Sequence, residues 1–147
     1  MALQSFYIPI ATVLAVTSSQ LIKLAINLKN SKSYAYEALF KEYGGMPSTH
    51  SALVVSTTSA IFFLEGFSTL FWLAVFWAAI TIADAMAAKW YFGLRDQFVN
   101  EMYKLIPKSK HKELKEFELN VGHSKLEILA GAILGTFVSY ITLLLIF

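Results

Sequence analysis

The sequence predicts an all-α integral membrane protein, a bundle of about four transmembrane helices with short cytoplasmic-side helices in its loops. Apolar residues make up 56% of the 147 residues, and the mean hydropathy is +0.56. This length fits one membrane-embedded domain over residues 1–147. Because the chain contains no cysteine, disulfide bonds and thiol chemistry are excluded.

Four apolar segments are the candidate helices. A membrane-spanning helix needs about 20 mostly apolar residues. The first segment has Lys23 close to its C-terminal end. The second segment is shorter, is rich in Ser and Thr, and starts at Pro47. Only the turn Glu65-Gly66 separates the second segment from the third, and the fourth runs to the C-terminal residue. The segments cover residues 6–28, 47–64, 67–88 and 126–147.

The basic residues orient this bundle. All twelve Lys and Arg lie between Lys23 and Lys125, and none lies in the Glu65-Gly66 turn. With four spans they gather at one face, which the positive-inside rule makes cytoplasmic. We therefore expect both termini on the opposite side of the cell membrane. No basic residue precedes the first apolar run, so no signal peptide is expected.

Residues 44–51, Gly-Gly-Met-Pro-Ser-Thr-His-Ser, are the most informative motif. A Gly-rich turn followed by Pro, Ser and Thr is typical of the start of a helix. The unpaired N–H groups of a first helical turn bind anions. His50 can give or take a proton beside such an anion. The motif therefore predicts phosphate chemistry at a membrane surface.

The predicted topology places the unusual polar residues near the same interface. Asp84 lies inside an apolar run, where a carboxylate usually has a partner or a function, and Lys89 and Arg95 are its candidate partners. Lys23, Ser48 and His50 also have simpler interpretations, as a snorkelling lysine, an N-cap and a solvated histidine. The gathered residues are Lys23, Ser48, His50, Asp84, Lys89, His123 and Glu127.

His123 and Glu127 are four residues apart and share one helical face. A carboxylate at this spacing can hold the imidazole in one tautomer and leave the other ring nitrogen nucleophilic. Ser124 and Glu127 also form a Ser-x-x-Glu capping box, in which Glu127 only caps the helix. Both interpretations stay open on spacing. Gly131 and Gly135 form a small-xxx-small pattern that predicts close helix packing.

These motifs resemble the divergent branch of the type 2 phosphatidic acid phosphatase superfamily, which is related to acid phosphatases and vanadium haloperoxidases. Residues 44–51, Asp84-Ala85 and the segment from Gly122-His123 to Gly131 resemble its motifs. The resemblance implies a phosphoric monoester hydrolase without metal or other cofactor. It implies that His123 is the nucleophile, Glu127 orients it and His50 protonates the leaving group. The expected phosphate-binding residues are Lys23, Ser48, Thr49, Asp84, Lys89 and Arg95.

At several positions where the family motifs carry arginine, this chain has a different residue. Lys89-Trp90 stands where the branch carries an Arg pair, and Asn30-Ser31 follows Lys23 where the superfamily has Arg-Pro. Phosphate oxygens prefer bidentate Arg contacts. The superfamily's Ser-Arg before the last motif is replaced by Glu116-Phe117.

Three functions are therefore compared. The first is a lipid-phosphate phosphatase at the cytoplasmic interface. Its partners are its lipid substrate and the bilayer, and this function is compatible with a homo-oligomer. The second is a metal-dependent hydrolase using the same polar cluster. The third is a non-catalytic membrane scaffold or transporter. Nucleic-acid binding is not expected, because acids nearly balance the bases and give a net charge of +2. Phosphatidate, phosphatidylglycerol phosphate and isoprenyl phosphates would all place an anionic headgroup at this depth, and they are the candidate substrates.

Overall fold

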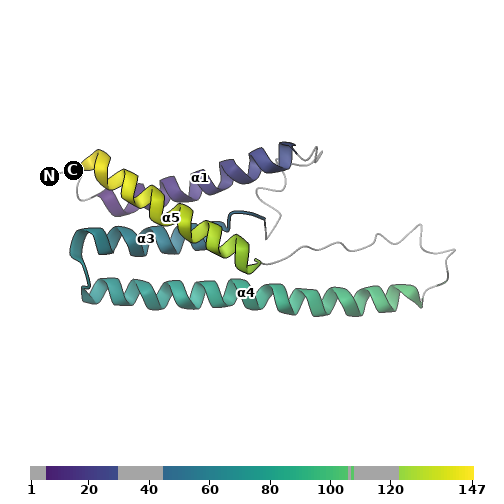
Figure 1. Cartoon of the computed structure of the whole chain (residues 1–147). Helices are drawn as coiled ribbons and strands as arrows, with labels where there is room; N and C mark the ends of the chain where they lie inside the picture. The colour runs from purple at the N-terminus through teal and green to yellow at the C-terminus, as the bar shows by residue number, and fades with distance from the viewer. Residues whose placement is uncertain (1–5, 30–44, 106, 108–122) are drawn as a thin grey trace.

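The structure is a computed structural model that describes residues 6–29, 45–105, 107 and 123–147. Its four elements are all helices, so the all-α membrane bundle is confirmed for these residues (Figure 1). The remaining loop residues, where the sequence predicts short helices and which include His111, lie outside the described residues. The elements are α1 Tyr7–Lys29, α3 Thr49–Glu65, α4 Thr69–Lys104 and α5 Lys125–Ile146.

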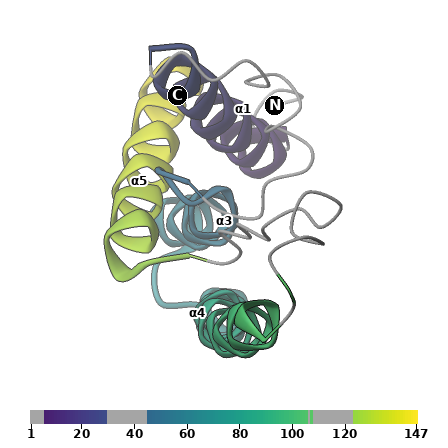
Figure 2. The ribbon, with the colours of Figure 1, turned by 90° about the vertical axis from the view of Figure 1, so that its right-hand side faces the viewer.

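Helix α3 is the centre of the bundle. It contacts α1, α4 and α5, and α1 and α5 also contact each other (Figure 2). Small side chains allow these close approaches, since Ala11, Ala15, Ala52 and Ala60 are fully buried. Helix α4 packs chiefly against α3 and stands at the edge of the three-helix core.

The closest helix contact is between α3 and α5. A Cβ on Gly131 would overlap the carbonyl oxygen of Ser48, and a Cβ on Gly135 would lie 2.6 Å from that of Ala52. One turn further along, the hydroxyls of Ser56 and Ser139 lie 2.8 Å apart in the buried interface. The close helix packing that the small-xxx-small pattern predicts is confirmed, and the structure shows that the partner of α5 is α3.

Three helices, α1, α4 and α5, are long and apolar enough to cross a membrane. At 17 residues α3 is at the short end of the spanning range. Helix α4, with 36 residues, runs well past the third apolar segment. The sequence predicts that the third apolar segment ends at residue 88 and that short helices follow in the loop, whereas α4 continues without a break to Lys104, because apolar residues recur there at helical spacing. Pro107 follows shortly after the helix ends, where a helix cannot continue.

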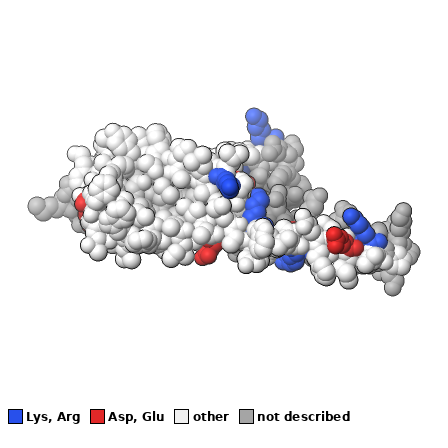
Figure 3. Space-filling model, turned by 60° about the horizontal axis from the view of Figure 1, so that its bottom comes forward, with Lys and Arg blue, Asp and Glu red and all other residues white. Residues whose placement is uncertain are grey.

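The two ends of the bundle differ in charge. Tyr7 and Phe147 are in edge contact with ring centroids 6.0 Å apart, so the start of α1 and the end of α5 lie at one end. The described Lys and Arg side chains gather toward the other end (Figure 3). This is the end where α3 and α5 begin and α1 ends.

Candidate active site

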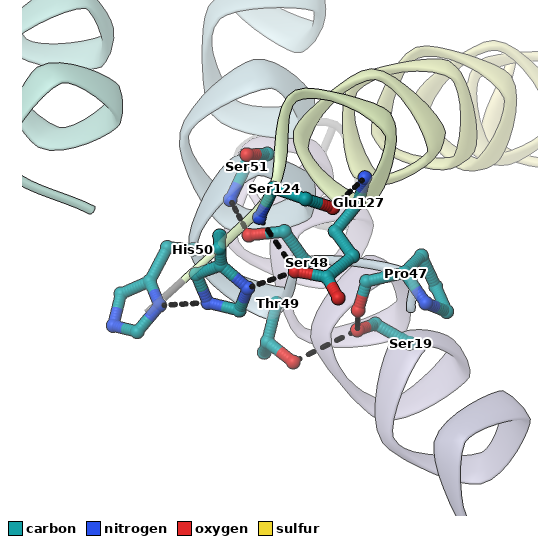
Figure 4. Close-up of polar contacts among 9 residues, drawn as sticks. Ser19, Pro47, Ser48, Thr49, His50, Ser51, Ser124 and Glu127 are labelled. Atoms are coloured by element: carbon teal, nitrogen blue, oxygen red, sulfur yellow. Dashed lines mark hydrogen bonds and ion pairs between the residues drawn. The ribbon is translucent and has the colours of Figure 1, made fainter. Parts of the chain in front are cut away.

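Two histidines meet at the basic end of the bundle. His50 lies in the first turn of α3, and His123 lies just before Ser124, the N-cap of α5. The Nδ1 atom of His50 is 3.2 Å from the Nε2 atom of His123, within hydrogen-bond distance (Figure 4). His123 is buried with 4% of its surface exposed, whereas His50 is exposed. Two residues 73 positions apart in the chain are thus direct neighbours.

Backbone contacts fix the two helix starts against each other. The N–H of Ser48 donates to the carbonyl oxygen of Glu127 at 2.8 Å, joining α3 to the first turn of α5. The glycine at position 131 admits the carbonyl of Ser48 one turn further on. The N–H of His123 donates to the carbonyl of Ala85 at 3.3 Å, which ties the same point to α4. Three helices therefore hold the histidine pair.

The carboxylate of Glu127 caps α5 and also lies near the ring of His123. Its Oε2 atom accepts a hydrogen bond from the N–H of Ser124 at 2.7 Å, and the Ser124 hydroxyl accepts from the N–H of Glu127, so the capping box is present. The same Oε2 lies 3.5 Å from Nδ1 of His123. This distance is in ion-pair range but too long for a strong hydrogen bond. Among the described residues, the buried Nδ1 has no closer partner.

The environment of His123 favours its neutral form. Burial lowers the pKa of the imidazole most, and the positive charges of Lys23 and His50 lower it further. The Glu127 carboxylate opposes these effects in part. The net result is a pKa below the ordinary value of about 6.5, so His123 is unprotonated at neutral pH. An unprotonated ring nitrogen is what a nucleophile requires.

The other residues of the Gly-Gly-Met-Pro-Ser-Thr-His-Ser motif connect the site to α1. Ser48 is fully buried, and its hydroxyl accepts the N–H of Ser51 as an N-cap. The Thr49 hydroxyl lies 2.9 Å from that of Ser19, which also donates to the carbonyl of Pro47. The contribution of Ser19 was not predicted from the sequence, because a serine inside an apolar segment has no distinguishing pattern.

Lys23 approaches the site from α1. A Cβ on Gly45 would lie 4.0 Å from its Cδ atom. Gly45 has φ +84°, a left-handed conformation that glycine adopts at no steric cost. The ammonium of Lys23 is close enough to lower the pKa of His123. The structure therefore brings together Lys23, Ser48, Thr49, His50, His123 and Glu127.

The α4 residues are placed differently. The Asp84 side chain is exposed, and the carbonyl oxygen of its neighbour Ala85 accepts a hydrogen bond from the N–H of His123. Lys89, one turn further along α4, is half-buried. Arg95 lies further out, where it pairs with Asp96 at 3.4 Å and stacks over Phe92 at 4.8 Å. The structure does not bring Arg95 to the histidine pair.

A shared metal site was the alternative use of this cluster. In the part of the chain that the structure describes, no group of three or more His, Cys, Asp or Glu side chains is placed to hold a metal ion. Asp84, one of the four candidate ligands with His50, His123 and Glu127, has an exposed side chain on α4.

These features define a class of protein, a small helical membrane protein with a histidine pair and a carboxylate at its basic end. The chain belongs to the Divergent PAP2 family, which matches residues 5–138. It is 30% identical over 141 residues to the uncharacterized membrane protein YuiD of Bacillus subtilis (strain 168), with 86% of this chain and 87% of the relative covered. No solved structure matches the chain.

Proposed function

We propose that the protein is a metal-independent lipid-phosphate phosphatase that works at the cytoplasmic membrane interface through a phosphohistidine. The observation that carries this proposal is the buried His123 between His50 and the Glu127 carboxylate, in surroundings that lower the pKa of its imidazole. If Nδ1 of His123 carries the proton and faces Glu127, Nε2 holds the free electron pair. His50 must then donate through its Nδ1–H to that nitrogen. Membership of a PAP2 family supports phosphatase-related chemistry.

In the first step, Nε2 of His123 attacks the phosphorus atom. A P–N bond forms while the bond from phosphorus to the lipid oxygen breaks. The lipid oxygen takes the proton from Nδ1 of a doubly protonated, cationic His50 and leaves as an alcohol, so His50 is the general acid and ends the step neutral. Glu127 stabilises the positive charge that develops on the His123 ring.

In the second step, a water molecule replaces the alcohol. His50, now without its proton, accepts one from the water, whose oxygen attacks phosphorus. The P–N bond breaks, and phosphate leaves with His123 neutral again. The phosphoryl group must occupy the space that the 3.2 Å contact between the two rings now spans. His50 is exposed and can move aside, whereas His123 is fixed by burial.

The surroundings favour an anionic lipid headgroup. Lys23 and the N-terminal end of α3 supply positive potential beside the histidines. Ser48 and Thr49 lie at the same helix start. The site is at the end of membrane-crossing helices, the depth at which a lipid phosphate lies. Lys89 is the α4 residue best placed to add a further cation, and we assign no phosphate contact to Arg95.

The test is phosphate release from a panel of lipid phosphates by the purified protein in detergent. We expect release that persists with a chelator and is inhibited by vanadate. His123→Ala should remove essentially all turnover, whereas His111→Ala, which changes the third histidine, should not. Release that stops with the chelator indicates a metal-dependent hydrolase, and no release from any substrate indicates a non-catalytic protein. Either result refutes the proposal.

A further inference from the structure

The outer face of α4 continues well past the part of the helix that crosses the membrane. At about 1.5 Å per residue, 36 residues give a helix of about 54 Å, whereas the hydrocarbon core of a bilayer is about 30 Å thick. The apolar segment of α4 ends near Ala88, so about 16 residues, 89–104, extend beyond it. Figure 1 shows α4 running past the starts of α3 and α5 at this end.

Large apolar side chains are exposed along one side of this extension. Trp90, Leu94 and Phe98 follow one another at four-residue steps and are 63%, 47% and 64% exposed. Tyr91, at 65%, and Met102, at 51%, flank them. Side chains three or four residues apart lie on one face of a helix. The extension therefore presents a continuous stripe of large apolar side chains that no described residue covers.

The stripe continues the exposed face of the membrane-spanning part of α4, which is the face expected to contact lipid. Steps of three and four residues lead back from Trp90 through two exposed alanines to Ile80 and Phe76, which are 62% and 63% exposed. The side facing α3 is the opposite one, where Ala74 and Ala78 are buried. The large apolar residues of the extension are as exposed as those that face lipid within the span. The continuous face runs through Phe76, Ile80, Ala83, Ala87, Trp90, Leu94 and Phe98.

We propose that this face of residues 90–98 lies on the cytoplasmic leaflet of the same bilayer, with Trp90, Leu94 and Phe98 inserted among the lipids and the exposed Glu101 at its end in the headgroup layer. In the structure α4 is one straight helix (Figure 1), so this placement requires α4 to bend away from α3 after Ala88 in the membrane, which turns the side remote from the bundle toward the lipid. Trp and Tyr at the start of the extension suit the headgroup boundary. Arg95 and Lys104 lie at the borders of the apolar face, where their charges reach water or lipid phosphates.

The absence of cysteine makes the test direct, because each single-cysteine variant carries one spin label. Phe98→Cys reports on the stripe, and Asn100→Cys reports on the other side of the helix. Leu73→Cys, 64% exposed within the span, is the lipid-facing reference. Each labelled protein is reconstituted in vesicles that contain anionic lipid. Accessibility is measured to oxygen, which enters lipid, and to a water-soluble nickel chelate.

We expect the label at residue 98 to be severalfold less accessible to the chelate than the label at residue 100, and to resemble the label at residue 73. Equal access of the chelate to residues 98 and 100 means that the extension projects into water and overturns the proposal. Dipolar coupling between labels at residue 98 at high dilution in lipid means that a second copy covers the stripe, which also overturns it. Neither result depends on phosphatase activity.

Discussion

At the residue scale, one carboxylate oxygen of Glu127 makes two contacts. Oε2 accepts the N–H of Ser124 at 2.7 Å and faces Nδ1 of His123 at 3.5 Å. The cap that begins α5 thus also holds the carboxylate beside the histidine. Capping needs only a hydrogen-bond acceptor, whereas stabilising an imidazolium needs a negative charge.

Glu127→Gln separates these two purposes. The glutamine oxygen can still accept from Ser124, so we expect an unchanged melting temperature. Loss of the charge should lower turnover by about 100-fold or more, by analogy with neutralising the carboxylate of a catalytic triad. Ser124→Ala is the matched control, because losing a cap costs about 1 kcal/mol of stability and leaves the charge in place. A fully active Glu127→Gln protein would reduce Glu127 to a helix cap.

Lys23 offers a pH test of the same site. Activity that needs the free electron pair of His123 is lost as pH falls through its pKa, which burial and positive charge hold below about 6.5. The neutral ring also favours the folded state above that pH, and this contribution is lost on acidification. Lys23→Met removes a positive charge that lowers the pKa. The acid limb of kcat/KM should therefore move to higher pH.

The matched control for this change is Lys29→Met, which removes an exposed lysine in the last turn of α1. Its acid limb should coincide with that of the unmodified protein. NMR titration of the His123 imidazole gives the same comparison without turnover. An unchanged His123 pKa in Lys23→Met would remove Lys23 from the electrostatics of the site.

At the scale of elements, the contact between α3 and α5 positions both histidines. A methyl group at Gly131 meets the Ser48 carbonyl, a backbone atom that cannot rotate away. We expect Gly131→Ala to destabilise the fold by about 1–3 kcal/mol, the usual cost of overpacking. Gly93→Ala is the control, since nothing lies within 4 Å of a Cβ there and alanine favours a helix. Thermal unfolding in detergent measures both, and equal melting temperatures would contradict the close packing.

The elements also show what the sequence predicts and where it stops. Hydropathy located the helices, and the spacing of Gly131 and Gly135 predicted a close contact. The partner of that contact depends on the tertiary arrangement, so Ser48 and Ala52 could not be named in advance. The end of α4 was misplaced because charged residues after Ala88 suggest a loop, whereas helical spacing persists to Lys104.

In the candidate site too, the sequence predicts which residues gather but not their contact partners. Residue types and helix starts predicted that His50, His123 and Glu127 share one interface. The contribution of the Ala85 carbonyl was missed, because a main-chain contact has no side-chain signature. The position of Arg95 was missed for another reason, since its distance from the site follows from the straight continuation of α4.

At the scale of the whole molecule, charge distribution predicts that the site faces the cytoplasm. In intact cells, we expect a single cysteine at Glu65, in the turn between α3 and α4, to react with a membrane-impermeant maleimide. A single cysteine at Lys29, at the basic end, should react only after the membrane is permeabilised. The cysteine-free chain is the background control. Reaction of the Lys29→Cys variant alone in intact cells would reverse the orientation.

The central claim is that His123 forms a covalent bond to phosphorus. The direct measurement is mass spectrometry of protein quenched in alkali during turnover of a lipid phosphate, because phosphohistidine is acid-labile. We predict a phosphoryl group on His123 in the unmodified protein and none in His123→Ala. His50→Ala should turn over about 10²- to 10⁴-fold more slowly, since it lacks the general acid. Turnover with the phosphoryl group on another residue, or without any phosphorylated protein, would contradict the account.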